Sequence, residues 1–151
     1  MTLAGLITAV AEECLDAVKE YRLTADGAGL QPVTVFEQEV PEEVFDHDDT
    51  GKYHPLMCVA LTETTEEENM TEAEIVITIA TYSEEVDGWK DLINLTDVLL
   101  IRFLKHRLLK KKYRLTAAPV GEILVKPPVP FRYAYVTMRY ALWQVQEERG
   151  K

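Results

Sequence analysis

The stretch TYSEEVDGWKDLINLTDVLLIRFLKHRLLKKKYRL, residues 81–115, largely decides which fold the sequence can adopt. Its apolar residues recur at three- and four-residue spacing, which predicts an amphipathic helix from about Gly88 to Lys112 with Asp87 as its N-cap. The end of this helix is basic, and Lys and Arg there interact favourably with the helix dipole. The predicted apolar stripe consists of Trp89, Leu92, Ile93, Thr96, Leu99, Leu100, Phe103 and Leu104.

Segments on both sides of this helix alternate between apolar and polar residues, a pattern that predicts strands. The clearest is AEIVITIATYS, residues 73–83, which places Ile75, Ile77 and Ile79 on one face. The other predicted strands are residues 33–40, 55–63, part of 115–131, and the aromatic-rich 132–146.

The N-terminal 21 residues predict a second amphipathic helix, with Thr2 as its N-cap. Residues 24–32 are predicted to break this helix, and residues 64–72 to form a solvated connection. Because only one helix separates the strands, we expect an α+β fold, in which two helices pack on a mainly antiparallel sheet of about 4–5 strands.

The composition predicts one domain spanning residues 1–151, of a size that buries about 70% of the surface of its extended chain. A hydrophobic content of 47% with 28% charged residues is typical of a soluble globular protein. No apolar run reaches the ~20 residues that span a bilayer, and the N-terminal apolar run is interpreted as a helix and not as a signal peptide. We expect acidic loops at about 41–54 and 63–73, and a charged tail at 146–151.

Charge is strongly segregated along the chain, whose net charge is −10. Residues 37–74 hold 13 acidic residues against Lys52 alone, a local net charge of −12. Residues 102–114 hold seven Lys or Arg and no acid, a local net charge of +7. The sequence therefore predicts two oppositely charged surfaces.

One acidic segment, DHDDTGKYH (46–54), contains side chains that could bind a metal. Read as an EF-hand loop from Asp46, it has Met57 where a bidentate Glu is required. A zinc site needs ligands held on rigid elements, which one loop does not supply. We interpret the segment as a solvated acidic loop, and we expect no metal and no cofactor.

No catalytic constellation is found in the sequence. Cys14 and Cys58 lie in apolar surroundings, where a free cysteine behaves as a small core residue, and no C-x-x-C pair is present. The three histidines form no recognisable triad, and neither glycine-rich nucleotide motif occurs. We therefore expect that the protein is not an enzyme.

The basic segment allows several interpretations: a helix end suited to its dipole, a nucleic-acid contact, a membrane contact, or an interface between copies. Leucines lie between the basic residues where nucleic-acid binding would need stacking groups, and the acidic segment opposes membrane contact. If the positive surface of one copy meets the negative surface of the next, the contact is heterologous and can close into a ring. The residues predicted for an inter-subunit or partner interface are Arg102, Lys105, Arg107, Lys110, Lys111, Lys112, Glu66, Glu67, Glu68, Pro128 and Phe131.

The order of these elements, over Leu56–Trp143, resembles small tail-terminator (tail-completion) proteins encoded by prophages of Gram-positive bacteria. A strand ending in Thr-Tyr leads to a Gly-aromatic pair that opens the helix, and a Tyr-Arg-Leu and a Pro-aromatic segment then precede the last strand. The matching residues are Thr81, Tyr82, Gly88, Trp89, Asp91, Leu92, Asn94, Leu95, Tyr113, Arg114, Leu115, Pro128, Pro130, Phe131 and Trp143.

The resemblance implies a subunit of a virion tail, assembled in the bacterial cytoplasm, with Trp89 as an anchor in the core. Six copies would form a ring that caps the tail tube, ends its polymerisation and provides the docking surface for the neck and head connector. The implied partners are other copies, the tail tube protein and a neck or head-completion protein, with no sequence-specific nucleic acid and no membrane. The alternatives are a head–tail neck adaptor, which would share nearly every sequence feature, and a small metal-binding enzyme.

Overall fold

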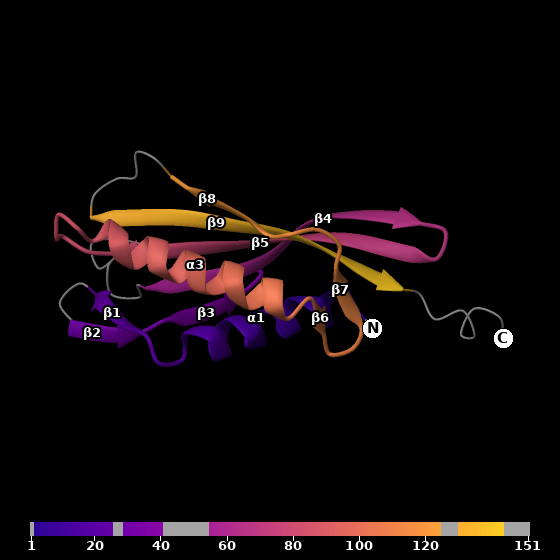
Figure 1. Cartoon of the computed structure of the whole chain (residues 1–151), viewed down its shortest axis with the longest axis horizontal. Helices are drawn as coiled ribbons and strands as arrows, with labels where there is room; N and C mark the ends of the chain where they lie inside the picture. Colours follow the sequence, from indigo (N-terminus) through magenta and orange to yellow (C-terminus); the bar gives the residue numbers. More distant parts are fainter. Residues whose placement is uncertain (1, 26–28, 41–54, 125–129, 144–151) are drawn as a thin grey trace.

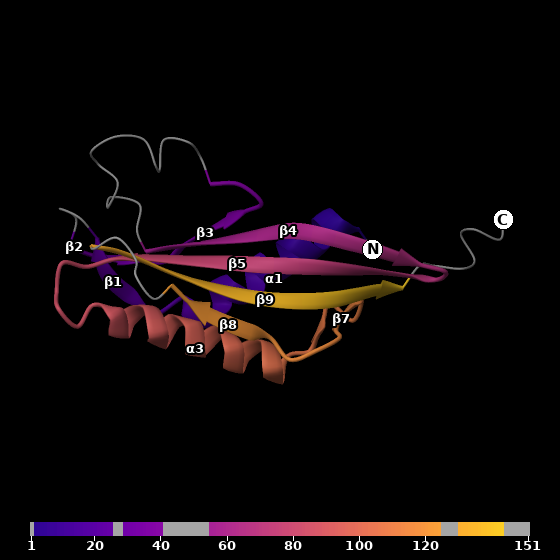
Figure 2. The same cartoon turned by 90° about the horizontal axis from the view of Figure 1, so that it is seen from above.

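A computed structural model of the chain describes residues 2–25, 29–40, 55–124 and 130–143. Helices α1 (Leu3–Val18) and α3 (Trp89–Lys105) pack against a curled sheet (Figures 1 and 2). The strands are β1 (Arg22–Ala25), β2 (Gly29–Pro32), β3 (Thr34–Glu37), β4 (Leu56–Glu67), β5 (Met70–Tyr82), β6 (Leu108–Leu109), β7 (Tyr113–Leu115), β8 (Val120–Ile123) and β9 (Phe131–Trp143).

The main sheet is mixed but mostly antiparallel. Its strand order is β3-β4-β5-β9-β7-β6, and β8 pairs with β9. Among the described strands only the β3–β4 pair is parallel. Strands β1 and β2 form a separate two-stranded sheet. The predicted α+β class, with two helices on a mainly antiparallel sheet, is confirmed. The predicted number of strands was too low, since the main sheet has seven in the described part of the chain.

The core lies between the helices and one face of the central strands. Cross-strand pairing places Ile75, Ile77 and Ile79 of β5 opposite Met138, Val136 and Ala134 of β9, and all six are buried. Burying a large aliphatic side chain stabilises the fold by about 1.5–3 kcal/mol. The helices cover this face with Leu6, Val10 and Cys14 of α1 and with Leu92, Leu95, Leu99 and Phe103 of α3.

The N-terminal helix begins as predicted, because the backbone N–H of Gly5 donates to Thr2 Oγ1 at 2.8 Å. Residues 24–32 lie beyond the end of the helix at Val18, as predicted, and β1 and β2 pair in this part of the chain. Leu23 of β1 packs against the core.

The predicted solvated connection at 64–72, and the acidic loop at 63–73, were wrong. The β4–β5 ladder continues through this segment from Glu63↔Glu74 to Glu67↔Met70, and the turn occupies only Glu68 and Asn69. The hairpin extends beyond the helices at one end of the molecule (Figures 1 and 2). The acidic side chains of this segment led to the prediction of a loop. The backbone pairing of β4 with β5 shows that it is a hairpin. The other predicted acidic loop, 41–54, and the tail, 146–151, lie outside the described residues.

The second helix is shorter than predicted at its basic end. It ends at Lys105 with His106 as C-cap, where the prediction placed the end at Lys112. The chain then returns as β6 and β7, which buries Leu109 and Tyr113 beside the sheet. A continued helix would carry both side chains away from the core, so tertiary packing overrides the helical pattern.

The start of this helix also differs from the prediction. Gly88 is the N-cap, without a side-chain cap, and Asp87 instead forms an exposed ion pair with Lys90 at 3.7 Å. Trp89 is 49% exposed, so its expected role as a core anchor was wrong. The core is filled at this end of the helix by Leu92 and Leu95. Leu104, another predicted member of the stripe, is exposed as well.

Candidate interaction surfaces

Helices α1 and α3 are joined by a group of ion pairs near the C-terminus of α3. Arg102 Nε lies 3.1 Å from Glu13 Oε2, and the same guanidinium pairs with Asp16. His106 Nδ1 lies 2.9 Å from Glu13 Oε2. A hydrogen bond from Lys19, together with the positive charges of Lys19 and Arg102, lowers the pKa of Asp16. With only 21% and 19% of the Arg102 and Glu13 side chains exposed, this pair is the most protected of the group.

The segment after α3, residues 107–114, forms a tight hairpin that we name the basic hairpin. Two contacts tie it to α1. Lys110 Nζ lies 2.7 Å from Glu12 Oε1, which raises the pKa of Lys110. Tyr113 Oη donates to the backbone oxygen of Thr2 at 3.2 Å. A Cβ at Gly5 would lie 2.6 Å from Tyr113 Oη, so glycine allows this close approach.

Two adjoining cavities lie beside these contacts and form a cleft between α1 and α3. The larger, about 630 Å³, is lined by charged residues of both helices and by Leu108 and Leu109. The smaller, about 280 Å³, is lined by Ala17, Val98 and Ile101 and has charged residues at its edge. The cleft thus offers apolar surface beside charged residues of both signs, with Arg102, Lys105, Arg107 and Lys110 against Glu12, Glu13 and Asp16.

The predicted basic interface residues fall into two groups. Arg102 and Lys110 contact α1, so part of the positive charge is neutralised within the chain. Lys105 and, on the basic hairpin, Arg107, Lys111 and Lys112 are exposed, and the described residues provide none of them with an ion-pair partner. These four remain available for an external partner.

The predicted acidic interface residues, Glu66, Glu67 and Glu68, are exposed at the tip of the β4–β5 hairpin. This tip and the turn between β6 and β7 lie toward the same end of the molecule (Figures 1 and 2). Phe131 begins β9, half-buried, and meets Tyr82 edge to face with the ring centroids 5.1 Å apart. Pro128 lies outside the described residues.

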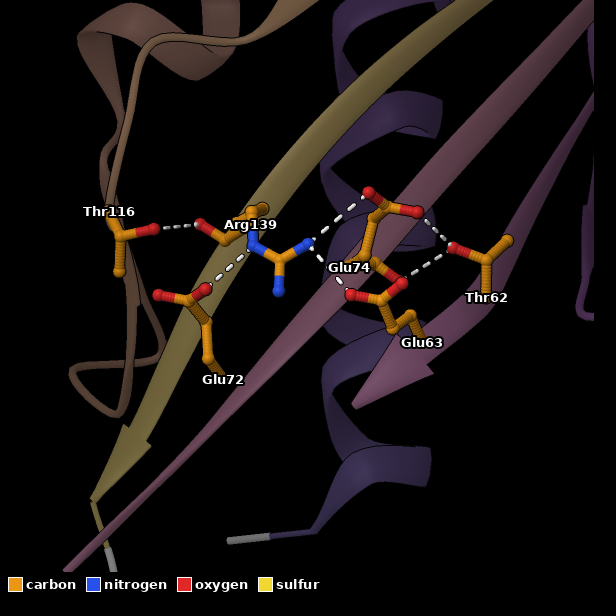
Figure 3. A network of polar contacts seen from close by, with 6 residues as sticks. All are labelled: Thr62, Glu63, Glu72, Glu74, Thr116 and Arg139. Atoms are coloured by element: carbon orange, nitrogen blue, oxygen red, sulfur yellow. Dashed lines mark hydrogen bonds and ion pairs between the residues drawn. The ribbon is translucent and has the colours of Figure 1, made fainter. Parts of the chain in front are cut away.

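A polar network holds the acidic hairpin to the sheet (Figure 3). Arg139 of β9 reaches three carboxylates of β4 and β5: its Nε donates to Glu72 at 2.6 Å, and its Nη1 lies 3.3 Å from Glu74 and 3.4 Å from Glu63. Thr62 Oγ1 donates to Glu74 at 2.7 Å. Because one cation serves three acids, this surface keeps a negative charge.

The turn before α3 is held by a buried cation. Arg132 of β9 is only 7% exposed, and its Nη1 and Nη2 donate to the backbone oxygens of Ser83 and Glu85 at 2.9 and 3.3 Å. A Cβ on Gly88 would lie 2.6 Å from Arg132 Nη1, so glycine permits the close packing. This fixed turn carries Val86, which is 93% exposed.

The two cysteines and the possible metal ligands were the other candidates for a chemical site, and in the described residues they do not form one. Burial raises the pKa of the thiols of Cys14 and Cys58, which disfavours their nucleophilic thiolate form. Among the described residues no group of three or more His, Cys, Asp or Glu is placed to hold a metal ion. The predicted metal-ligand segment 46–54 lies outside them. In the same part of the chain, no helix has the length and hydropathy of a membrane span.

Two features of these surfaces escaped the sequence analysis. The acids Glu12, Glu13 and Asp16 of α1 pair with the basic segment, a contact that the sequence analysis did not predict. A run of acids on one helix and a run of bases on another was the available signal. No sequence pattern predicted that Arg132 would be buried beneath the turn at 83–88, because its burial depends on strand β9 reaching that turn.

No protein-family model matches the chain, and a search of curated proteins finds no match. Among solved structures, the chain is similar to a chain of a virion of the native gene transfer agent (GTA) particle. The two are 13% identical, the alignment covers 95% of this chain and 99% of the other, and the TM-score is 0.45. A TM-score this low, with so few identities, does not establish a common function.

Proposed function

We propose that the protein is a structural subunit of a phage-like particle and that it acts at the end of the tail. Copies form a ring, with six as the expected number, that caps the tail tube and ends its polymerisation. The ring then presents a docking surface to the neck and head connector. Its work is assembly, without catalysis.

The observation that carries this proposal is the resemblance of residues 56–143 to tail-terminator proteins. The segments that show it lie together in the fold, because β5, β9 and β7 are neighbours in the sheet and α3 packs against β5 and β9. Gly88, the first residue of the Gly-aromatic pair, packs against Arg132, and Tyr113 of the Tyr-Arg-Leu motif fastens the basic hairpin to α1. The motif residues therefore have structural roles that hold the turn and the hairpin in place.

The charged surfaces support an assembly role. The basic hairpin is unpaired at Lys111 and Lys112 among the described residues, and the β4–β5 hairpin presents three consecutive acids at its tip. Exposed ion pairs contribute only about 0–1 kcal/mol each, so the charges on either hairpin act mainly on the register and speed of association with whichever partner that hairpin meets. The stability of the ring must come from apolar contacts between copies.

The proposal is tested by adding the purified protein to growing tail tubes. We expect it to bind tube ends and to limit tube length, as seen by electron microscopy. Replacing Lys110, Lys111 and Lys112 by Glu should abolish capping while the circular dichroism spectrum stays unchanged. Tubes that reach the same length with and without the wild-type protein would contradict the proposal.

A neck adaptor is the second candidate, since it needs the same oligomeric surfaces. Particles assembled without this protein separate the two roles. Over-long tails indicate a terminator, and tails of normal length that stay unjoined to heads indicate an adaptor.

A further inference from the structure

We propose that the ring contact joins the two ends of helix α3: the turn that begins α3 in one copy docks at the basic end of α3 in the next. This inference rests on the proposed function, because it specifies the contact between copies in the ring. It assigns the acidic half of that contact to the turn at 83–91, and it leaves the β4–β5 tip for another partner.

The first half of the contact, which we name the α3-start patch, is an exposed apolar pair with an acidic rim. Val86 and Trp89 are 93% and 49% exposed. Residues 84–91 contain four acids and one base, a net charge of −3. Tryptophan is enriched among the residues that dominate the binding energy of interfaces. The rim residues are Glu84, Glu85, Asp87, Lys90 and Asp91.

This patch is held rigid from beneath. Arg132 donates to the backbone oxygens of Ser83 and Glu85, and the backbone N–H of Ser83 donates to the oxygen of Pro130 at 3.0 Å. The N–H of Glu85 also donates to Ser83 Oγ at 3.1 Å. A surface fixed in advance loses little conformational entropy on binding, so this turn can present its apolar pair at low cost.

The second half lies at the other end of the same helix and has the opposite charge. Ile101, Leu104 and Leu108 are 54%, 42% and 46% exposed. Leu108 belongs to the basic hairpin, and Ile101 and Leu104 lie in the last turns of the helix before it. Residues 107–114 of the hairpin contain five bases and no acid. Ile101 also lines the smaller cavity of the α1–α3 cleft, about 280 Å³, which offers an apolar recess for a side chain such as Trp89.

The opposite charges of the two surfaces, and their positions at the two ends of α3, favour a second copy of the chain as the binding partner. Each half combines exposed apolar side chains with charge, and the signs are opposite. The halves lie at opposite ends of a 17-residue helix, about 25 Å apart along its axis (Figures 1 and 2). Two different surfaces on opposite sides of one subunit form a head-to-tail contact, the type that closes into rings. The β4–β5 tip, in contrast, lies toward the same end as the basic hairpin.

The test uses charge reversal in the full-length protein. An acid-side variant carries Glu84→Lys, Glu85→Lys and Asp87→Lys. A base-side variant carries Arg107→Glu, Lys111→Glu and Lys112→Glu, which leaves the Lys110–Glu12 pair intact. A control variant carries Glu66→Lys, Glu67→Lys and Glu68→Lys.

In sedimentation velocity, with and without tail tubes, we expect each of the first two variants to stay monomeric. An equimolar mixture of the two should assemble, because every contact in an alternating ring is then complementary. The control should assemble as the wild type does. Circular dichroism and thermal melts confirm that each variant folds.

A second measurement follows the apolar half of the contact. In a Trp143→Phe background, emission from Trp89 should shift to the blue on assembly, because the indole leaves water. Trp89→Ser should weaken assembly at least about tenfold.

The outcomes separate this inference from the proposed function. If the wild type assembles and caps tubes but the acid-side variant does so equally well, the inference is wrong and the proposed function stands. If the control variant stays monomeric and the base-side variant rescues it, the acidic half belongs to Glu66–Glu68. A wild type that neither assembles nor binds tubes contradicts both.

Discussion

The turn of the basic hairpin has two lysines in an uncommon backbone conformation. Lys110 and Lys111 have φ angles of 52° and 59°, in the left-handed region that glycine and asparagine occupy more readily. Lys110 contacts Glu12, whereas the described residues give Lys111 no ion-pair partner. Strained residues that persist in a structure often serve function, which agrees with a role for this turn in binding.

We predict that Lys111→Gly stabilises the isolated subunit by about 0.5–1 kcal/mol, because the left-handed strain is relieved at some cost in chain entropy. Urea unfolding measures this change. Lys112→Gly is the matched control, because Lys112 lies in the same turn without a positive φ. It should bring no gain, and equal stabilisation by both variants would show that backbone strain is not the cause.

Two contacts between elements decide how the surfaces are presented. The Arg139 network joins β4, β5 and β9 at the base of the acidic hairpin (Figure 3). The ion pairs of Glu13 and Asp16 with Arg102 join α1 to α3 beside the basic hairpin. In both places a charged group of one element is satisfied by another element far away in the sequence.

We predict that Arg139→Met lowers the urea midpoint of unfolding, because three carboxylates lose their shared cation. In a Glu72→Gln background the same replacement should cost less, since one charge has already been removed. A double-mutant cycle in urea measures the coupling between the two residues. Equal costs in the two backgrounds would mean that Arg139 and Glu72 are not coupled.

The ion pairs between α1 and α3 should also respond to pH. The pKa of Asp16 is lower in the folded chain, so its ionised form contributes stability above the unfolded pKa. That contribution disappears as the pH falls through the folded pKa. We therefore expect Asp16→Asn to have a lower urea midpoint than the wild type at pH 7, with the difference shrinking toward pH 3. A difference that is constant with pH would exclude this charge as its source.

At the scale of the whole molecule, the described residues form a curled sheet with two helices packed on it, and charged hairpins lie toward one end. The chain's net charge of −10 opposes association of copies, so contact requires that opposite local charges meet. Salt screens such charges, with a Debye length of about 10 Å at 0.1 M and about 3 Å at 1 M.

We predict that the association rate of copies falls severalfold between these two salt concentrations, while dissociation changes less, because apolar contacts hold the formed ring. Stopped-flow light scattering measures both rates. The acid-side and base-side variants, mixed with each other, should show the same dependence. Association that speeds up with salt would indicate an apolar contact in which charge only repels.

The sequence by itself determined the α+β class, the first helix with its Thr2 cap, and the shared face of Ile75, Ile77 and Ile79 in β5. These features follow from local periodicity, which any chain segment carries with it. The tertiary structure alone decided that α3 stops at Lys105, that Trp89 faces solvent, and that Arg132 supports the turn before α3. Each of these depends on contacts between segments that are distant in sequence. A local sequence pattern does not predict which distant segment a residue will contact. For the same reason, the charges of the basic segment were evident from the sequence, but their partial neutralisation by α1 was not.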